Sequence, residues 1–273
     1  MTFRLFCLRS AWPDCAWQLP MIETTTKIMT GDGPMPTWIV HPDEPGTFPL
    51  VIFYMDALGI REELRDMCRR IASVGYGVYL PNLYYRDGGP SFDPAPLARG
   101  QLEPAMMALN DALSMAMTVE DCAALLAHAQ LNPVIRMPAA VIGFCMGGRH
   151  AIAAAAAYPQ QILAMASLHG GRLVTDQDDS AHRRIAQMQA EAYFAWAQDD
   201  PVAPASHAAM VQQALEARAL PYRLEWHPDA LHGFTFPERF CYHKVSAERV
   251  WSRLFGLFRR NLAVAPSVQK EVA

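Results

Sequence analysis

The stretch "AAVIGFCMGGRHAIAAAAAY", residues 139–158, decides the fold because it joins two kinds of secondary structure through a glycine-rich turn. Its first apolar residues predict a buried strand, and its alanine-rich second half predicts a helix. At the junction, "GFCMG" (residues 143–147) has the pattern G-x-C-x-G, the cysteine version of a nucleophile elbow. So tight a turn leaves no room for side chains two residues before or after the nucleophile, whose strained backbone lifts its side chain clear of the sheet. The stretch therefore predicts that Cys145 is an exposed nucleophile.

The helix predicted after Cys145 supports this interpretation. A helix N-terminus carries partial positive charge, which lowers the pKa of a nearby thiol and stabilises an oxyanion. Two alternatives remain open: a buried cysteine that packs beside a pair of glycines, and a loop that binds a dinucleotide. The second is the weaker one, because "GFCMGG" lacks the G-x-G-x-x-G spacing and comes late in the order of elements.

Outside this stretch, apolar runs alternate along the chain with segments of helical periodicity. We expect strands at residues 22–30, 35–42, 49–55, 77–85, 138–144, 162–170, 191–198 and 222–228, and helices at 61–76, 102–117, 118–129, 149–158, 205–219 and 246–262. The Gly- and Pro-rich segment 87–100 is expected to form a loop or lid. This alternation predicts an α/β fold with a mostly parallel central sheet and helices on both faces.

The same pattern predicts one domain over residues 21–262. The first 20 residues lack the long apolar core of a secretory signal, so we expect a poorly packed extension, with a weak targeting segment as the alternative. Residues 263–273 are expected to be a frayed tail.

Composition narrows the classes of function. The chain has 273 residues and a net charge of −4, and its charges are spread along the sequence, which argues against nucleic acid or an anionic membrane as partner. The longest apolar run, residues 151–158, is too short to span a bilayer. Six scattered cysteines form no CxxC pair and no Cys/His spacing suited to zinc. We therefore expect a reduced, cytoplasmic protein without a bound metal.

A nucleophile elbow is normally followed along the chain by an acid and then by a histidine. Asp200 and His232 each follow a predicted strand, so both can meet Cys145 at the carboxyl edge of the sheet. Asp199 is the rival acid, and Asp200 is preferred because it lies four residues before Pro204. His232 would take the thiol proton and return it to the leaving group, while Asp200 would fix the imidazole tautomer.

The chain also offers a rival base. His169, in "LHGG", ends another predicted strand. It is the weaker candidate and is expected to line the pocket instead.

Taken together, these segments resemble the dienelactone hydrolase family, the cysteine-dependent branch of the α/β-hydrolase fold, over residues 22–262. The segments that carry the resemblance are "VIFYMDALGIREELRDMCRRIASVGYGVYLPNLYYR" (51–86), "GFCMGG" (143–148), "DDPVAP" (199–204) and "LHGF" (231–234). The resemblance implies hydrolysis of enol-lactones or related esters, without a metal or an organic cofactor. It places the nucleophile on Cys145, the acid on Asp200 and the base on His232.

The resemblance also implies roles for residues around the nucleophile. Asp56 occupies the place of an acidic residue near the resting thiol, where the best-known members of the family have a glutamate. Its shorter side chain puts the usual contact with the sulfur in doubt, and a turn-capping aspartate is the alternative. The oxyanion donors would be the backbone N–H groups of Ala57 and Met146.

In lactone-specific members of the family, two arginines hold the substrate carboxylate. Arg86 matches the first, but Phe236 stands at the place of the second, and Arg239 comes three residues later. Losing one arginine suggests a different or less anionic substrate, and Arg86 could instead cap a surface loop. The apolar wall of the substrate pocket would be formed by Tyr84, Tyr85, Phe144 and Phe234.

The sequence thus predicts a hydrolase that cleaves a small ester or lactone, such as a dienelactone, through an acyl-thioester on Cys145. Two alternatives share the fold: a thioesterase or acyl transferase, and a catalytically silent binding protein. The oligomeric state is left open.

Overall fold

The computed structural model describes residues 20–262, so the expectations for residues 1–19 and for the tail from residue 263 lie outside the described residues. Eight strands form one sheet in the order β1-β2-β4-β3-β5-β6-β7-β8. The strands are β1 (Met21–Thr30), β2 (Gly33–Pro42), β3 (Phe48–Tyr54), β4 (Gly77–Pro81), β5 (Ile135–Phe144), β6 (Ile162–Leu168), β7 (Glu191–Ala197) and β8 (Tyr222–His227). β1 and β2 pair antiparallel, and β2 joins β4 antiparallel, whereas β4 through β8 in sheet order are parallel.

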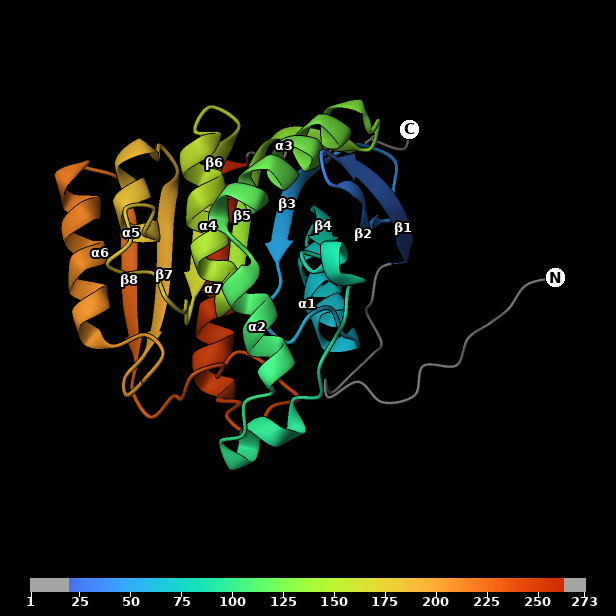
Figure 1. Cartoon of the computed structure of the whole chain (residues 1–273). Helices are drawn as coiled ribbons and strands as arrows, with labels where there is room; N and C mark the ends of the chain where they lie inside the picture. Colours follow the sequence, from blue (N-terminus) through green and yellow to red (C-terminus); the bar gives the residue numbers. More distant parts are fainter. Residues whose placement is uncertain (1–19, 263–273) are drawn as a thin grey trace.

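Helices cover both faces of this sheet. They are α1 (Glu62–Ala72), α2 (Pro104–Ala112), α3 (Met115–Leu131), α4 (Met146–Ala157), α5 (Ala181–Arg184), α6 (Ala205–Ala217) and α7 (Lys244–Asn261). α3 and α4 lie on one face, and α1 and α7 lie together on the other (Figure 1). The predicted α/β-hydrolase fold, with its mostly parallel sheet, is confirmed.

Burial explains why the central strands read as continuous apolar runs. Every residue of β3 and of β4 is buried, because helices cover both of their faces. The edge strand β1 is mostly exposed instead, and Ile28 is its one buried residue. No helix within residues 20–262 is long and apolar enough to cross a membrane.

One predicted boundary between helices is wrong. The sequence suggested helices at 102–117 and 118–129, with a start at Thr118, but α2 ends at Ala112 and α3 begins at Met115. Ser114 caps α3, because its hydroxyl accepts a hydrogen bond from the N–H of Met117 at 3.2 Å. Thr118 is buried inside α3, and its hydroxyl hydrogen-bonds to Nδ1 of His150 in α4 at 2.9 Å.

The excursion between β4 and α3 lies at the carboxyl edge of the sheet. It holds two short 3₁₀ turns, at Tyr85–Asp87 and Ala95–Arg99, and then α2. β3 points toward the edge at which α2 lies (Figure 1). The loop predicted at 87–100 is therefore partly ordered into helical turns, and it lies where a ligand of a parallel sheet binds.

Candidate active site

The elbow between β5 and α4 holds Cys145 in an unusual backbone conformation. Its φ is 52° and its ψ is −115°, which a residue with a side chain adopts only under strain. The strain follows from close packing of the flanking glycines. A Cβ at Gly143 would lie 1.9 Å from the carbonyl oxygen of Gly147, and a Cβ at Gly147 would lie 2.5 Å from that of Tyr54. The turn has the shape that the sequence pattern predicts.

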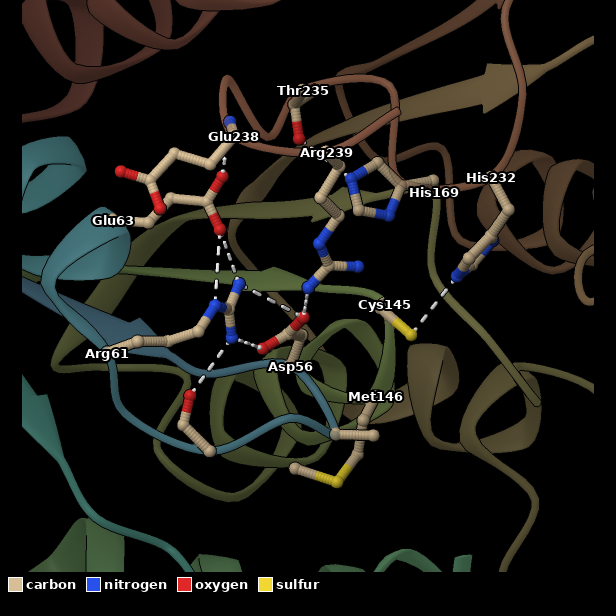
Figure 2. Close-up of polar contacts among 12 residues, drawn as sticks. Asp56, Arg61, Glu63, Cys145, Met146, His169, His232, Thr235, Glu238 and Arg239 are labelled. Carbon is tan, nitrogen blue, oxygen red and sulfur yellow. Dashed lines mark hydrogen bonds and ion pairs between the residues drawn. The ribbon is translucent and has the colours of Figure 1, made fainter. Parts of the chain in front are cut away.

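Cys145, His232 and Asp200 lie in one hydrogen-bonded row. Nε2 of His232 lies 3.1 Å from Sγ of Cys145, and Nδ1 lies 2.6 Å from Oδ2 of Asp200. Figure 2 shows the imidazole turned toward the sulfur. The other carboxylate oxygen of Asp200 accepts hydrogen bonds from the N–H groups of Val202 and Ala203 at 2.8 and 3.2 Å, which fixes its orientation. The rival Asp199 is exposed, so the geometry favours Asp200.

The electrostatics of this row favour charge separation. Burial alone would raise the pKa of the Cys145 thiol, but the charge and hydrogen bond of His232 lower it. Burial alone would lower the pKa of His232, but the charge at Cys145 and the hydrogen bond to Asp200 raise it to about 10. The arrangement therefore favours a thiolate beside an imidazolium at neutral pH.

Asp56 lies just after β3 in a buried cluster of charges beside Cys145 (Figure 2). Its Oδ1 accepts from Nη1 of Arg61 at 2.7 Å, and its Oδ2 accepts from Nη2 of Arg239. Burial would raise the pKa of this carboxyl, but Arg239 and Arg61 lower it. Asp56 thus hydrogen-bonds to two arginines rather than to the sulfur, as its short side chain suggested.

Sequence reasoning missed two members of this cluster, Arg61 and Glu63. Oε2 of Glu63 accepts from Nη2 of Arg61 at 2.7 Å, and its Oε1 accepts from the N–H of Glu238 at 2.8 Å. The cluster therefore connects the start of α1 to the segment after His232. Its only local signal is that Arg61 follows soon after the expected acidic position, whereas the segment around residue 238 is far away in the sequence.

A cavity of about 160 Å³ opens beside Cys145 and His232. The excursion between β4 and α3 supplies much of its wall, and the apolar residues that it contributes are Leu97, Leu102, Met106 and Met107. The polar side chains at the cavity are Asp56, Asn110, Arg149, Arg172 and Arg239. Thus the excursion acts as the expected cover of the site.

The two expected oxyanion donors also line this cavity. Ala57 lies in a tight turn in which the N–H of Gly59 donates to the carbonyl of Asp56 at 3.2 Å. Met146 is the first residue of α4, where a backbone N–H has no acceptor within the helix. The Tyr84 hydroxyl donates to the carbonyl of Ala57 at 3.0 Å and contacts Sδ of Met146 at 3.3 Å. Tyr84 therefore connects the turn that holds Ala57 to the start of α4.

Arg86 does not reach the cavity. Its guanidinium forms two hydrogen bonds with the buried carboxylate of Asp121, at 2.9 and 3.0 Å, and a third with Asp32 at 2.7 Å. The hydroxyl of Tyr85 also donates to Asp121. The buried carboxylate needs these donors, so both residues are held at the α3 side of β1 and neither lines the cavity.

Phe144 and Phe234, expected at the pocket wall, are core residues instead. Both are fully buried and absent from the cavity lining. Phe144 stacks on Phe53 with ring centroids 4.7 Å apart, and Phe234 packs against His169 and His227. Phe144 is the last residue of β5 and packs in the core, whereas the elbow that follows presents Cys145 to the cavity.

His169 lies behind His232 and, contrary to expectation, does not line the cavity. Its Nε2 hydrogen-bonds to the hydroxyl of Thr235 at 2.8 Å, and its ring meets that of His232 edge-on at 5.2 Å between centroids. Burial and the positive charge of His232 hold its pKa well below the ordinary value. It packs against the imidazole as a neutral ring.

Within residues 20–262, no group of three or more His, Cys, Asp or Glu side chains is arranged to hold a metal ion.

Comparison with known proteins identifies a family whose profile matches most of the chain. The sequence profile described as "Dienelactone hydrolase family" matches residues 35–262. A protein of Escherichia coli (strain K12) named "Putative carboxymethylenebutenolidase" is 30% identical over 241 residues, 86% of each chain. A Rhodococcus opacus protein named "Carboxymethylenebutenolidase" is 23% identical over 244 residues, 86% of this chain and 89% of the relative. The crystal structure of a "Putative Dienelactone Hydrolase" from Klebsiella pneumoniae has a TM-score of 0.79 and 26% identity, covering 88% of this chain and 99% of that one.

Proposed function

This chain belongs to the dienelactone hydrolase family, and we propose that it hydrolyses a carboxylic ester or an enol-lactone, such as a dienelactone, with Cys145 as its nucleophile. His232 is the base and Asp200 is the residue that orients it. The observation that carries the proposal is the row of contacts from Oδ2 of Asp200 through His232 to Sγ of Cys145, at 2.6 and 3.1 Å. The names of the relatives support the same class of substrate.

In the first half of the reaction, the thiolate of Cys145 attacks the carbonyl carbon of the substrate. The negative charge that forms on the carbonyl oxygen is stabilised by the N–H groups of Ala57 and Met146. When the intermediate collapses, the C–O bond breaks, His232 gives its proton to the departing oxygen, and a thioester remains on Cys145. In a lactone, the departing oxygen stays attached to the acyl group.

In the second half, His232 takes a proton from water, and the resulting hydroxide attacks the thioester carbonyl. The C–S bond breaks, the carboxylic acid leaves, and the thiolate–imidazolium pair is restored. Asp200 stabilises the imidazolium in both halves. Asp56 acts in this scheme as a fixed countercharge that holds Arg239 at the cavity wall.

The cysteines support a location in a reducing compartment. The four described cysteines, Cys68, Cys122, Cys145 and Cys241, are free thiols. Since structural disulfides are typical of oxidising compartments, we propose that the protein acts in the cytoplasm on a small-molecule substrate.

The test compares steady-state hydrolysis of p-nitrophenyl acetate and of a dienelactone by wild type and by Cys145→Ala. We expect the variant to lose about a thousandfold or more in kcat, because removal of a nucleophile leaves only binding and oxyanion stabilisation. Cys68→Ala is the matched control, since Cys68 is a buried cysteine on α1 away from the cavity. Acid quenching and mass spectrometry should find an acetyl group on Cys145. A Cys145→Ala enzyme that keeps its activity would show that another group is the nucleophile.

A further inference from the structure

The arginines around the site differ in one respect, which is whether a carboxylate neutralises them. Arg61 and Arg239 form ion pairs with Asp56, and Arg86 forms ion pairs with Asp121 and Asp32. Arg149 forms no ion pair with any carboxylate in residues 20–262. Its partners are both neutral, and both belong to one residue of α2.

Only one nitrogen of the Arg149 guanidinium is engaged. Nη2 donates to the carbonyl oxygen of Asn110 at 2.8 Å and to its Oδ1 at 2.9 Å. Within the described chain, Nε and Nη1 donate to no protein acceptor. The residue is 7% exposed, and the surface that remains open lines the cavity that holds Cys145 and His232.

The position of Arg149 relates it directly to the nucleophile. It lies four residues after Cys145, one turn along α4, so the two residues are on the same side of the helix and about 6 Å apart along its axis. The rest of the nearby wall is largely apolar, with Leu97, Met106 and Met107. A substrate whose carbonyl meets Cys145 therefore extends toward an unneutralised guanidinium.

Such a buried cation is costly without a ligand. Burial and the nearby charge of Arg172 lower the pKa of Arg149 to about 10, so it stays protonated at neutral pH. A buried charge without an ion-pair partner destabilises a fold. The two neutral acceptors and the charges at Cys145 and Asp111, which raise the pKa of Arg149, offset only part of that cost. Arg172 adds positive potential at the same rim, although its own guanidinium contacts Asp111.

We propose that Arg149 determines specificity by binding a carboxylate of the substrate, about one helical turn from the carbonyl that Cys145 attacks. The Nε–H and Nη1–H groups, which no protein acceptor occupies, can each donate a charge-assisted hydrogen bond to a carboxylate. The site is on α4 and α2, not at Arg86, where the family resemblance placed the substrate carboxylate. The proposal rests on the proposed function for the position of the reacting carbonyl.

The volume of the cavity fits a small substrate. A cavity of about 160 Å³ is of a size to hold a compact acid. The preferred substrate is then a short ester or lactone with a carboxylate separated from the reacting carbonyl by a few carbon atoms.

The test uses pairs of esters that differ in one charge. In the first pair, the p-nitrophenyl monoester of glutaric acid carries a carboxylate on its acyl group, and the corresponding terminal amide is its neutral partner. In the second pair, 4-acetoxybenzoate carries the carboxylate on its leaving group, and 4-acetoxybenzamide is its neutral partner. kcat/KM is measured for wild type, Arg149→Met and Arg149→Lys. Arg183→Met is the control, because Arg183 is an exposed arginine of α5 outside the cavity.

Wild type should prefer the charged member of at least one pair. Arg149→Met should lower the ratio of kcat/KM for the charged over the neutral ester by about 10- to 100-fold, the range for losing a hydrogen bond to a charged group. Arg149→Lys should recover part of the ratio, since it keeps the positive charge but not the planar guanidinium or its hydrogen bonds to Asn110. Arg183→Met should leave the ratio as in wild type.

Binding of glutarate and of glutaramide, measured by isothermal titration calorimetry, separates this proposal from the proposed function. If no ester is hydrolysed but wild type prefers glutarate and Arg149→Met does not, the carboxylate site stands and the hydrolase proposal fails. If esters are hydrolysed with the same charged-to-neutral ratio by wild type and Arg149→Met, the carboxylate site is overturned. An equal loss on both members of each pair, with an unchanged melting temperature, would also overturn it, because Arg149 would then act without regard to substrate charge.

Discussion

Replacing Asp56 with asparagine tests how far the buried charges beside the nucleophile depend on one carboxylate. Asp56 is 1% exposed and accepts hydrogen bonds from Arg61 and Arg239. Asparagine keeps the shape of the side chain but removes the negative charge that offsets two guanidinium groups. We expect Asp56→Asn to lower the free energy of unfolding.

The size of this loss depends on which ion pairs Arg61 and Arg239 keep in the variant. Arg61 retains its ion pair with Glu63 at 2.7 Å, whereas Arg239 has no second ion pair within residues 20–262. Removing one partner of a buried pair costs about 3–5 kcal/mol, because the other charge is left uncompensated. Since only Arg239 is left without a countercharge, we expect a loss of about 3 kcal/mol.

The variant should also change the response to acid. Burial alone would raise the pKa of Asp56, but Arg239 and Arg61 outweigh burial and lower it. A lowered pKa in the folded state contributes stability above the unfolded value of about 3.9, and this contribution is lost as pH falls toward the folded value. In Asp56→Asn that contribution is absent. Its free energy of unfolding should therefore fall less steeply than that of wild type as pH drops from about 5 to 3.

Urea unfolding followed by tryptophan fluorescence measures these losses, and Arg239→Met with the double variant completes a double-mutant cycle. Methionine can still cover Phe236, over whose ring the Arg239 guanidinium lies at 3.9 Å from the centroid. The double variant should be more stable than Asp56→Asn, because no uncompensated charge remains. A loss below about 1 kcal/mol for Asp56→Asn would refute the reasoning, as would a double variant whose two losses simply add.

Two further predictions concern the thiol of Cys145 and the arginine that lies outside the cavity, Arg86. Iodoacetamide should alkylate Cys145 rapidly near pH 7, because His232 lowers the pKa of its thiol. His232→Ala should slow the reaction about tenfold for each unit by which the thiol pKa comes to exceed the assay pH. Equal rates, read by mass spectrometry, would contradict the thiolate–imidazolium pair. Arg86→Met should lower the free energy of unfolding by about 1–3 kcal/mol, because the buried Asp121 loses two charge-assisted donors. The same variant should keep the wild-type preference between charged and neutral esters, and a changed preference would mean that Arg86 contacts the substrate.

Local rules predicted the elbow and the order of the elements well. The glycines around Cys145 are dictated by contacts within the turn itself, such as that between Gly143 and Gly147, so a short pattern carries the information. The strands were located to within a few residues because β3 and β4 are buried along their whole length and read as unbroken apolar runs.

The errors arose where the deciding contact joins distant parts of the chain. Thr118 has the sequence features of a helix start, but its hydroxyl pairs with His150 on another helix, and Ser114 provides the cap. Arg86 matches a family position, yet its guanidinium donates hydrogen bonds to the buried carboxylate of Asp121 on α3. Neither partner can be identified from the local sequence.

The site residues outside the elbow divide in the same way. Arg239 and Asp56, which form an ion pair, are 183 residues apart in the sequence, and no local pattern predicts their pairing. Arg149 could have been found: it is the residue one helical turn after the predicted nucleophile, charged in an otherwise alanine-rich helix.

The contact between α4 and the end of β3 has a consequence for how the two expected oxyanion donors tolerate change. A Cβ at Gly147 would lie 2.5 Å from the carbonyl oxygen of Tyr54 and 2.7 Å from that of Met55, so the helix rests on the backbone that leads into Ala57. Because Gly147 has no Cβ, α4 can approach the end of β3 closely. This close approach sets the distance between the N–H groups of Ala57 and Met146, which in the proposed mechanism bind the same substrate oxygen. In the proposed mechanism these two residues act through their N–H groups, whereas the buried Met146 side chain contacts the Tyr84 hydroxyl. Variation at Gly147, whose atoms lie outside the cavity, would instead move one donor away from the other.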